Sequence, residues 1–225
     1  MQERTGKRRC CFMRLRPAFL SGFSAFLYFW LVGFLMGKTL SMAKHQPWKH
    51  ISSRYIHQEK WFKLRADKVL KGNGQPMEPY YVTEYSHWVN VLPITTDGMA
   101  VLVRQYRYAL GVWSIEVPGG IMDPHETDPA EAARRELLEE TGYTAQHLQQ
   151  VAVLATNPAT QNNNLYAYLA TGCTLTHALN LDENEEIEVL LVAVDELVYM
   201  LRHNQIVQSL HTASIFYALQ ALGKV

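Results

Sequence analysis

Three glutamates, whose carboxylates can bind a metal ion, lie close together in one short segment with an arginine, which can hold a carboxylate in place. Glu136 and Glu140 are four residues apart, and Glu139 lies between them. On a helix this spacing places the carboxylates on neighbouring positions, with Cβ atoms about 5–6 Å apart, where they repel one another. A divalent cation would relieve that repulsion, and oxygen ligands without His or Cys favour Mg²⁺ or Mn²⁺ over zinc. Arg135, four residues before Glu139, can hold that carboxylate in place.

The residues around this cluster predict the helix that must position it. Asp128 is a favourable N-cap, Pro129 fits the first helical position, and Gly142 can adopt the left-handed conformation that ends a helix. We therefore predict a helix over residues 129–141. An ordinary solvated acidic face is the alternative interpretation, but the preceding Gly119-Gly120 loop and the marked helix ends argue against it.

The segment from Gly119 to Tyr143 resembles the Nudix box, G-x5-E-x7-R-E-U-x-E-E-x-G-U, in which U is bulky and apolar. The defined positions are filled by Gly120, Glu126, Arg135, Glu136, Leu137, Glu139, Glu140, Gly142 and Tyr143. The segment departs from the pattern once, because eight residues rather than seven separate Glu126 from Arg135. The extra residue falls in the loop before the helix, so it bears on Glu126 alone.

The resemblance implies an Mg²⁺- or Mn²⁺-dependent hydrolase. Its reaction would cleave the pyrophosphate bond of a nucleoside diphosphate linked to a second moiety X, releasing a nucleoside monophosphate and X-phosphate. It implies catalytic roles for Arg135, Glu136, Glu139 and Glu140, with the three glutamates and the carbonyl of Gly119 as metal ligands. The catalytic base is either a glutamate of the box or one of Glu183, Glu185, Glu186 and Glu188.

Residues outside the box resemble the branch that cleaves ADP-ribose and nucleoside-diphosphate sugars. The run Val101–Arg107 is similar to its V-x-Q-Y-R strand, and Pro158 falls 16 residues after Gly142, as in ADP-ribose pyrophosphatases. The substrate-binding residues implied are Arg104, Arg107, Glu116, Gly120 and Pro158, and we prefer Arg107 to Arg104 as the phosphate or sugar contact.

Two questions about this function stay open at the level of sequence. The loop of residues 157–164 lacks the glutamate that many ADP-ribose enzymes place there, so the substrate is either ADP-ribose or another nucleotide sugar. The alternative function is a catalytically silent module that binds or senses nucleotides. Such modules usually lose glutamates of the box, so the presence of all three favours turnover.

Strands that bracket one central helix predict an α/β fold, with a mixed sheet between helices. Asp97-Gly98 predicts a tight hairpin between two of the strands. The resemblance implies the Nudix α/β/α sandwich, and also a homodimer formed by exchange of the early strands. Strands are predicted over residues 61–69, 80–84, 88–95, 99–106, 114–117, 151–155, 165–170 and 187–194, and helices over 194–203 and 209–222.

Composition narrows the partners of the protein. The 225 residues carry a formal net charge of zero, which gives no indication of nucleic acid as a partner. Cys10, Cys11 and Cys173 provide neither a disulfide framework nor metal-ligand spacing. The expected partner is therefore a small nucleotide substrate.

The N-terminal region predicts a membrane anchor. Residues 17–37 contain no charged residue, and as a helix they are long enough to span a bilayer. A cleaved signal or transit peptide is one alternative, and a start at Met36 or Met42, which would give a cytoplasmic enzyme, is another. The predicted organisation is a basic tail over 1–16, a transmembrane helix over 17–37, a linker over 38–57 and the Nudix hydrolase domain over 58–225.

Overall fold

The computed structural model describes residues 46–60, 62–181 and 186–225. The predicted basic tail, residues 1–16, and the predicted membrane helix, residues 17–37, lie outside these ranges. Among the described residues, no helix combines the length and apolar character that crossing a membrane requires.

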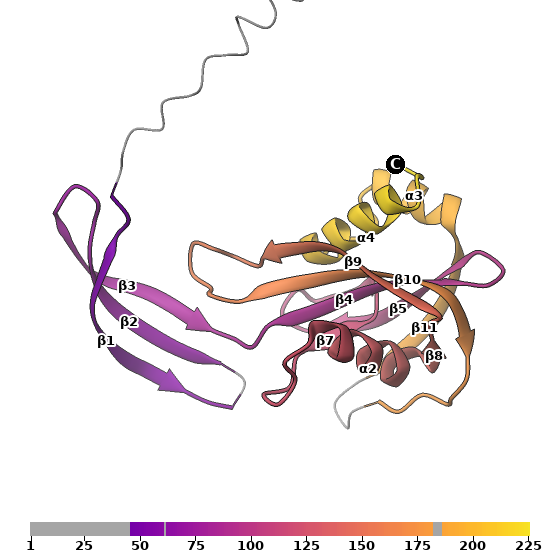
Figure 1. The fold of residues 1–225 in the computed structure, drawn as a ribbon, viewed down its shortest axis with the longest axis horizontal. Coiled ribbons are helices and arrows are strands. Elements are labelled where there is room, and N and C mark those ends of the chain that lie inside the picture. Colours follow the sequence, from indigo (N-terminus) through magenta and orange to yellow (C-terminus); the bar gives the residue numbers. More distant parts are fainter. Residues whose placement is uncertain (1–45, 61, 182–185) are drawn as a thin grey trace, which may run out of the picture. The chain divides into compact units, whose positions relative to one another are not determined.

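The described chain begins with a three-stranded antiparallel sheet in the order β1-β2-β3 (Figure 1). Its strands are β1 (Lys49–Gln58), β2 (Lys63–Leu70) and β3 (Pro76–Glu84). The predicted linker over 38–57 is therefore wrong from Lys49 onwards. Every residue of this edge strand is exposed, so it lacks the apolar alternation by which a half-buried strand is identified.

Polar contacts between strands stabilise this small sheet. The buried carboxylate of Asp67 on β2 accepts a hydrogen bond from Ser53 Oγ on β1 at 2.6 Å. Arg65 Nε donates to the same oxygen at 2.8 Å. Burial raises the pKa of Asp67, but the bonds from Arg65 and Ser53 outweigh it, and the net pKa lies below its ordinary value.

The second sheet has eight strands and carries the rest of the fold. Its path is β11-β5-β4-β10-β8, with β6 paired to β5, β7 to β4 and β9 to β10. The sheet is mixed, because β4 and β10 are parallel whereas the other pairs are antiparallel. The strands are β4 (Trp88–Thr95), β5 (Met99–Arg107), β6 (Val112–Glu116), β7 (Gly119–Ile121), β8 (Tyr143–Thr144), β9 (His147–Ala155), β10 (Asn164–Leu175) and β11 (Ile187–Ala193).

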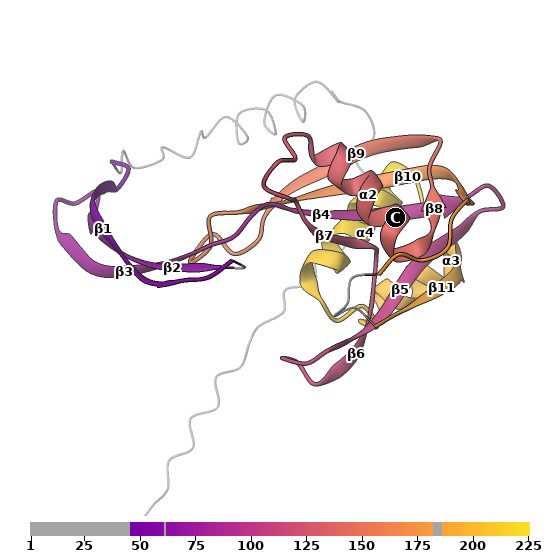
Figure 2. The same cartoon turned by 90° about the horizontal axis from the view of Figure 1, so that it is seen from below.

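Helices cover both faces of this sheet: α2 (Pro129–Thr141) lies on one side, and α3 (Val194–Arg202) and α4 (Ser209–Ala221) lie on the other (Figures 1 and 2). Each face has its own apolar cluster. Val89 and Val91 pack with α2, whereas Leu92, the next residue on β4, packs with α3 and α4. This alternation follows from the two-residue period of a strand. It confirms the predicted α/β fold with a mixed sheet.

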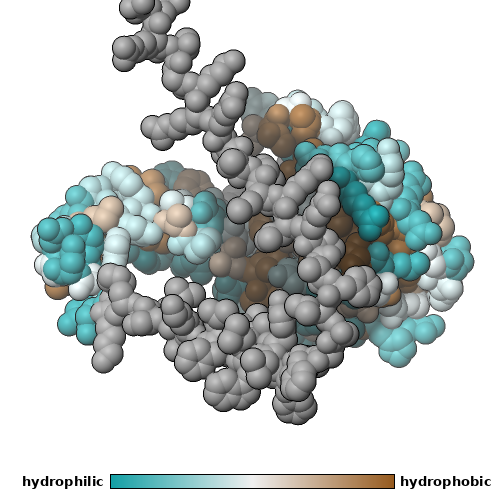
Figure 3. All heavy atoms as spheres, turned by 90° about the horizontal axis from the view of Figure 1, so that it is seen from above, coloured by the Kyte–Doolittle hydropathy of each residue, from teal (hydrophilic) through white to brown (hydrophobic). Residues whose placement is uncertain are grey.

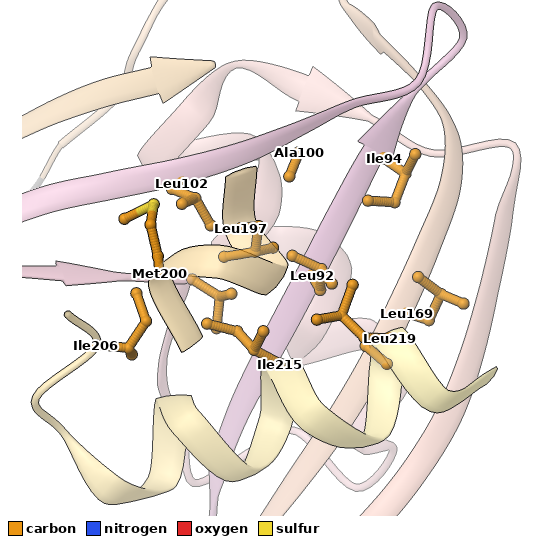
Figure 4. Packing of buried hydrophobic residues seen from close by; sticks show 12 residues of the cluster. Leu92, Ile94, Ala100, Leu102, Leu169, Leu197, Met200, Ile206, Ile215 and Leu219 are labelled. Atoms are coloured by element: carbon orange, nitrogen blue, oxygen red, sulfur yellow. The ribbon is translucent and has the colours of Figure 1, made fainter. Parts of the chain in front are cut away.

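The cluster beneath α4 fixes that helix firmly on the sheet. Ile215 and Leu219 project from α4 towards Leu92, and Leu197 of α3 lies beside them (Figure 4). All four side chains are fully buried, and burying each stabilises the fold by roughly 1.5–3 kcal/mol. The N-cap of α4 is Gln208, whose Oε1 accepts hydrogen bonds from the N–H groups of Leu210 and His211 in the first turn.

Candidate active site

Helix α2 has the limits and both caps that the sequence predicts. The N-cap carboxylate of Asp128 accepts a hydrogen bond from the Ala130 N–H at 2.9 Å. At the other end, Gly142 has a φ of 74° and donates its N–H to the Leu138 carbonyl. These caps satisfy backbone groups that would otherwise lack partners, so the register of the acidic face along the helix is well defined.

The three glutamates of α2 differ in burial. Glu136 and Glu140 are buried, with 8% and 3% of their surface exposed, whereas the side chain of Glu139 is 35% exposed. Buried carboxylates are costly unless they are hydrogen-bonded or bind a cation. Their position on the inner side of a surface helix is therefore not that of a solvated acidic face.

Gly119 and Gly120, which were predicted as a loop, instead begin strand β7, and they lie directly against the two buried carboxylates. The Gly119 N–H donates a hydrogen bond to Glu140 Oε2 at 2.9 Å. A Cβ atom added to Gly120 would lie 2.4 Å from Glu136 Oε1, so only glycine leaves this space open. Strand β7 and helix α2 thus form one site, as their proximity in the sequence suggested.

Arg135 connects the acids of the helix with the preceding loop. Its Nη1 donates to Glu136 Oε1 and to Glu139 Oε2, each at 2.9 Å. Its Nε and Nη2 donate to the two oxygens of Glu126 at 2.9 and 3.1 Å. The additional loop residue therefore leaves Glu126 within the site. The hydrogen bond from Arg135 is the main reason that the pKa of Glu126 lies below its ordinary value.

The residues of this site fit a hard divalent cation by chemistry. Glu136, Glu139 and Glu140 provide only oxygen donors, and glycine leaves room beside the first of them. In the ranges that the structure describes, no three acidic, His or Cys side chains converge as a ready ligand set. Here Arg135 bonds to Glu136 and Glu139, and the Gly119 N–H bonds to Glu140. These three glutamates and the Gly119 carbonyl are the groups that would hold the ion.

Two predicted substrate-binding residues are paired with each other. Glu116 is fully buried and accepts hydrogen bonds from Arg107 Nε and Nη2 at 2.9 and 2.5 Å. His211 Nε2 lies 3.0 Å from Glu116 Oε2. Burial raises the pKa of Glu116, but the bonds from Arg107 and His211 outweigh it, so that the net pKa is far below its ordinary value. The structure thus places Glu116 in an internal ion pair, and sequence reasoning missed His211, which lies in no motif.

A family model of the NUDIX domain matches residues 85–210, which include α2 and all eight strands of the second sheet. This match covers more than half of the 225 residues. The chain belongs to the Nudix hydrolase family. In this Nudix hydrolase a second model, the nucleoside diphosphate sugar hydrolase N-terminal domain, matches residues 48–83. The match covers β1, β2 and all of β3 except its last residue.

Relatives of this Nudix hydrolase span most of its length. An ADP-ribose pyrophosphatase of Bacillus subtilis is 30% identical over 175 residues, covering 77% of this chain and 91% of the relative. A methanol dehydrogenase activator of Bacillus methanolicus is 31% identical over 170 residues, covering 75% and 91%. A solved structure of an ADP compounds hydrolase aligns with a TM-score of 0.69 and 20% identity, over 81% of this chain and all of the other. That last likeness supports the fold alone.

Other predicted site residues of the Nudix hydrolase lie in different surroundings. Arg104 Nη2 contacts Glu188 Oε2 at 2.6 Å, and its guanidinium lies 5.3 Å from the centre of the Trp113 ring. Glu188, a candidate base, is thus engaged by an arginine of the neighbouring strand, whereas Glu183 and Glu185 lie outside the described residues. Pro158 is exposed in a turn whose next residue, Ala159, accepts a hydrogen bond from Tyr80 Oη at 2.6 Å.

Replacing Gly120 by alanine tests the role of the glycine loop. The added Cβ would meet the carboxylate end of Glu136, which can move, rather than backbone. We therefore expect G120A to fold, but to need about tenfold more Mg²⁺ for half-maximal activity. Activity measured against Mg²⁺ concentration, with thermal denaturation alongside, tests this. Ile121→Ala, at the exposed next position, is the control, and an unchanged Mg²⁺ requirement in folded G120A would contradict the assignment.

Proposed function

We propose that this Nudix hydrolase cleaves the pyrophosphate bond of ADP-ribose or a related ADP-sugar, giving AMP and a sugar phosphate. The observation that carries the proposal is the packing of Glu136 and Glu140 of α2 against Gly119 and Gly120. The N-terminal match to the nucleoside diphosphate sugar hydrolases and the likeness to an ADP-ribose pyrophosphatase support the choice of substrate class.

The residues of the site would have three different roles: metal binding, positioning of the carboxylates and contact with the phosphates. Glu136, Glu139 and Glu140 would hold Mg²⁺ or Mn²⁺, which when bound neutralises the pyrophosphate and lowers the pKa of a coordinated water. Arg135 holds two of these carboxylates, and its bidentate bond to Glu126 keeps the guanidinium in place. The glycine loop lets backbone come close to the reacting phosphates.

A panel of substrates tests this function. The purified protein is incubated with ADP-ribose, GDP-mannose, UDP-glucose, NADH, diadenosine polyphosphates and CoA, with Mg²⁺ or Mn²⁺, and the release of nucleoside monophosphate is measured. We expect ADP-ribose or an ADP-sugar to give the highest kcat/KM and to give no product when EDTA is present. Binding of these compounds without cleavage of any would instead support the silent nucleotide-binding module.

We also propose that the protein is a homodimer formed through its N-terminal sheet. Among the described residues, β1 has a hydrogen-bonded neighbour on one side alone, which is β2, and its Ile51 and Ile56 are 55% and 45% exposed. Figure 3 shows brown apolar residues among teal hydrophilic ones on the described surface. Such an edge can pair with the same edge of a second copy.

Light scattering should give twice the mass of one chain for the parent protein. The double variant Ile51→Glu, Ile56→Glu should give the mass of a single chain. Leu175→Glu, also exposed, is the control, and a monomeric parent protein would contradict the proposal.

A further inference from the structure

His211 reaches the active-site segment from the opposite side of the sheet. It is a buried residue of α4, which lies across the sheet from α2 (Figure 1). Its Nδ1 lies 3.3 Å from the Val117 backbone N–H, which can only donate, so Nδ1 is the acceptor. Nε2 then carries the proton and donates it to Glu116 at 3.0 Å. One imidazole therefore holds two successive residues of the chain.

These two residues lie where the backbone changes its partner strand. Strand β6 pairs with β5 as far as Glu116, opposite Val103, and β7 pairs with β4 from Gly119, opposite Asn90. The residues between them cross from one strand to the other. The buried N–H of Val117 needs an acceptor there, and His211 provides one.

The same crossing leads directly to the metal-binding groups. Gly119, two residues after Val117, donates its N–H to Glu140. The start of β7 has little free space, because a Cβ on Gly119 would lie 2.2 Å from the Val89 carbonyl oxygen and 2.6 Å from Asn90 Oδ1. Gly119 can therefore shift only if its neighbours shift as well.

Helix α4 also contacts Asn90, the residue of β4 that pairs with Gly119. Asn90 Nδ2 donates to Ser214 Oγ at 3.1 Å and lies 3.4 Å from His211 Nδ1. All three side chains are buried. Side chains of α4 thus bond to Val117, two residues before Gly119, and to Asn90, the strand partner of Gly119.

We propose that His211 is a positioning residue that sets the Gly119 backbone against Glu140, so that metal affinity depends on a side chain of α4. This inference rests on the proposed function, in which Gly119 and Glu140 hold the cation. Residues that orient metal ligands without touching the metal typically change metal affinity by about 10- to 100-fold when replaced.

Three substitutions separate the two bonds of the imidazole. Glutamine has both an acceptor and a donor, lysine has a donor for Glu116 but no acceptor for the Val117 N–H, and leucine has neither. Mn²⁺ binding is followed by electron paramagnetic resonance of the free ion, without substrate. We expect His211→Leu and His211→Lys to bind Mn²⁺ about tenfold more weakly, and His211→Gln to stay within a few fold of the parent protein.

Kinetic measurements and a matched control complete the test. At saturating Mg²⁺ the substrate KM should stay unchanged in His211→Lys, while the Mg²⁺ needed for half-maximal activity rises. Thr212→Val is the control, because Thr212 Oγ1 bonds to Ile206 and Gln208 at the start of α4. This variant should lower the melting temperature without weakening Mn²⁺ binding.

The outcomes distinguish this inference from the proposed function. Equal Mn²⁺ affinity in the lysine, glutamine and parent proteins would overturn the positioning role and leave the metal site standing. Absence of Mn²⁺ binding in the parent protein would overturn the proposed function and this inference together. The comparison of lysine with glutamine holds even if the leucine variant does not fold, because both retain a polar group in the site.

Discussion

Glu140→Gln is expected to lower Mg²⁺-dependent hydrolysis about a thousandfold while the protein stays folded. In the proposed function Glu140 would hold the metal ion, and loss of that charge would remove several kcal/mol of transition-state stabilisation; about 4 kcal/mol corresponds to a thousandfold change in rate. Glutamine has the same shape, and its carbonyl oxygen can still accept the hydrogen bond that the Gly119 N–H donates to Glu140. The measurement is kcat/KM at saturating Mg²⁺, with circular dichroism to verify the fold.

A second glutamate on the same helix serves as the control for this substitution. Glu131 is exposed in the first turn of α2, so Glu131→Gln removes the same charge away from the carboxylate cluster. Its activity should remain within about twofold of the parent protein, because exposed charges have small effects. Full activity of Glu140→Gln would contradict the assignment of the metal site.

Arg107→Leu is expected to lower the free energy of unfolding by about 2 kcal/mol at neutral pH. Removing one partner of a buried ion pair typically costs about 3–5 kcal/mol. The expected loss is smaller here because the Arg107 side chain is 44% exposed and His211 still donates to Glu116. Urea denaturation at pH 7 measures it. The control is Arg104→Leu, whose partner Glu188 is 53% exposed, so that its loss should stay below about 1 kcal/mol.

The same variant should show a characteristic pH dependence. In the parent protein the folded-state pKa of Glu116 is lowered, so its contribution to stability is present above the ordinary pKa of 4.5 and is lost as the pH falls through the folded-state pKa. Without Arg107, burial instead favours the protonated acid. The stability difference between parent and variant should therefore shrink between pH 7 and about pH 4.5. A difference that stays constant with pH would contradict this role of the ion pair.

The sequence predicted well where local signals determine the structure. The limits of α2 follow from Asp128, Pro129 and Gly142, whose conformational preferences act within a few residues. The contact of Arg135 with Glu139 follows from helical spacing in the same way. The central strands β4 and β5 were predicted to within one residue. Apolar side chains are buried along most of β4 and the first half of β5, so both strands appear in the sequence as apolar runs.

What the sequence did not predict depends on contacts between distant segments. Strand β1 is exposed throughout, and its pairing with β2 rather than its own residues makes it a strand. The pairing of Glu116 with His211 joins residues far apart in the chain and leaves no pattern of spacing. The sequence also left open whether the loop before α2 could accommodate one extra residue without displacing Glu126. The hydrogen bond from Arg135 to Glu126 shows that it can.

A crystal structure with Mn²⁺ and a methylene-bridged analogue of ADP-ribose would test the central claim most directly. Mn²⁺ is located by its anomalous scattering, and the bridge prevents cleavage. The ion should lie among the carboxylates of Glu136, Glu139 and Glu140 and the Gly119 carbonyl, in contact with the diphosphonate. An anomalous peak elsewhere, with these side chains still bonded only to Arg135 and the glycine loop, would contradict the account.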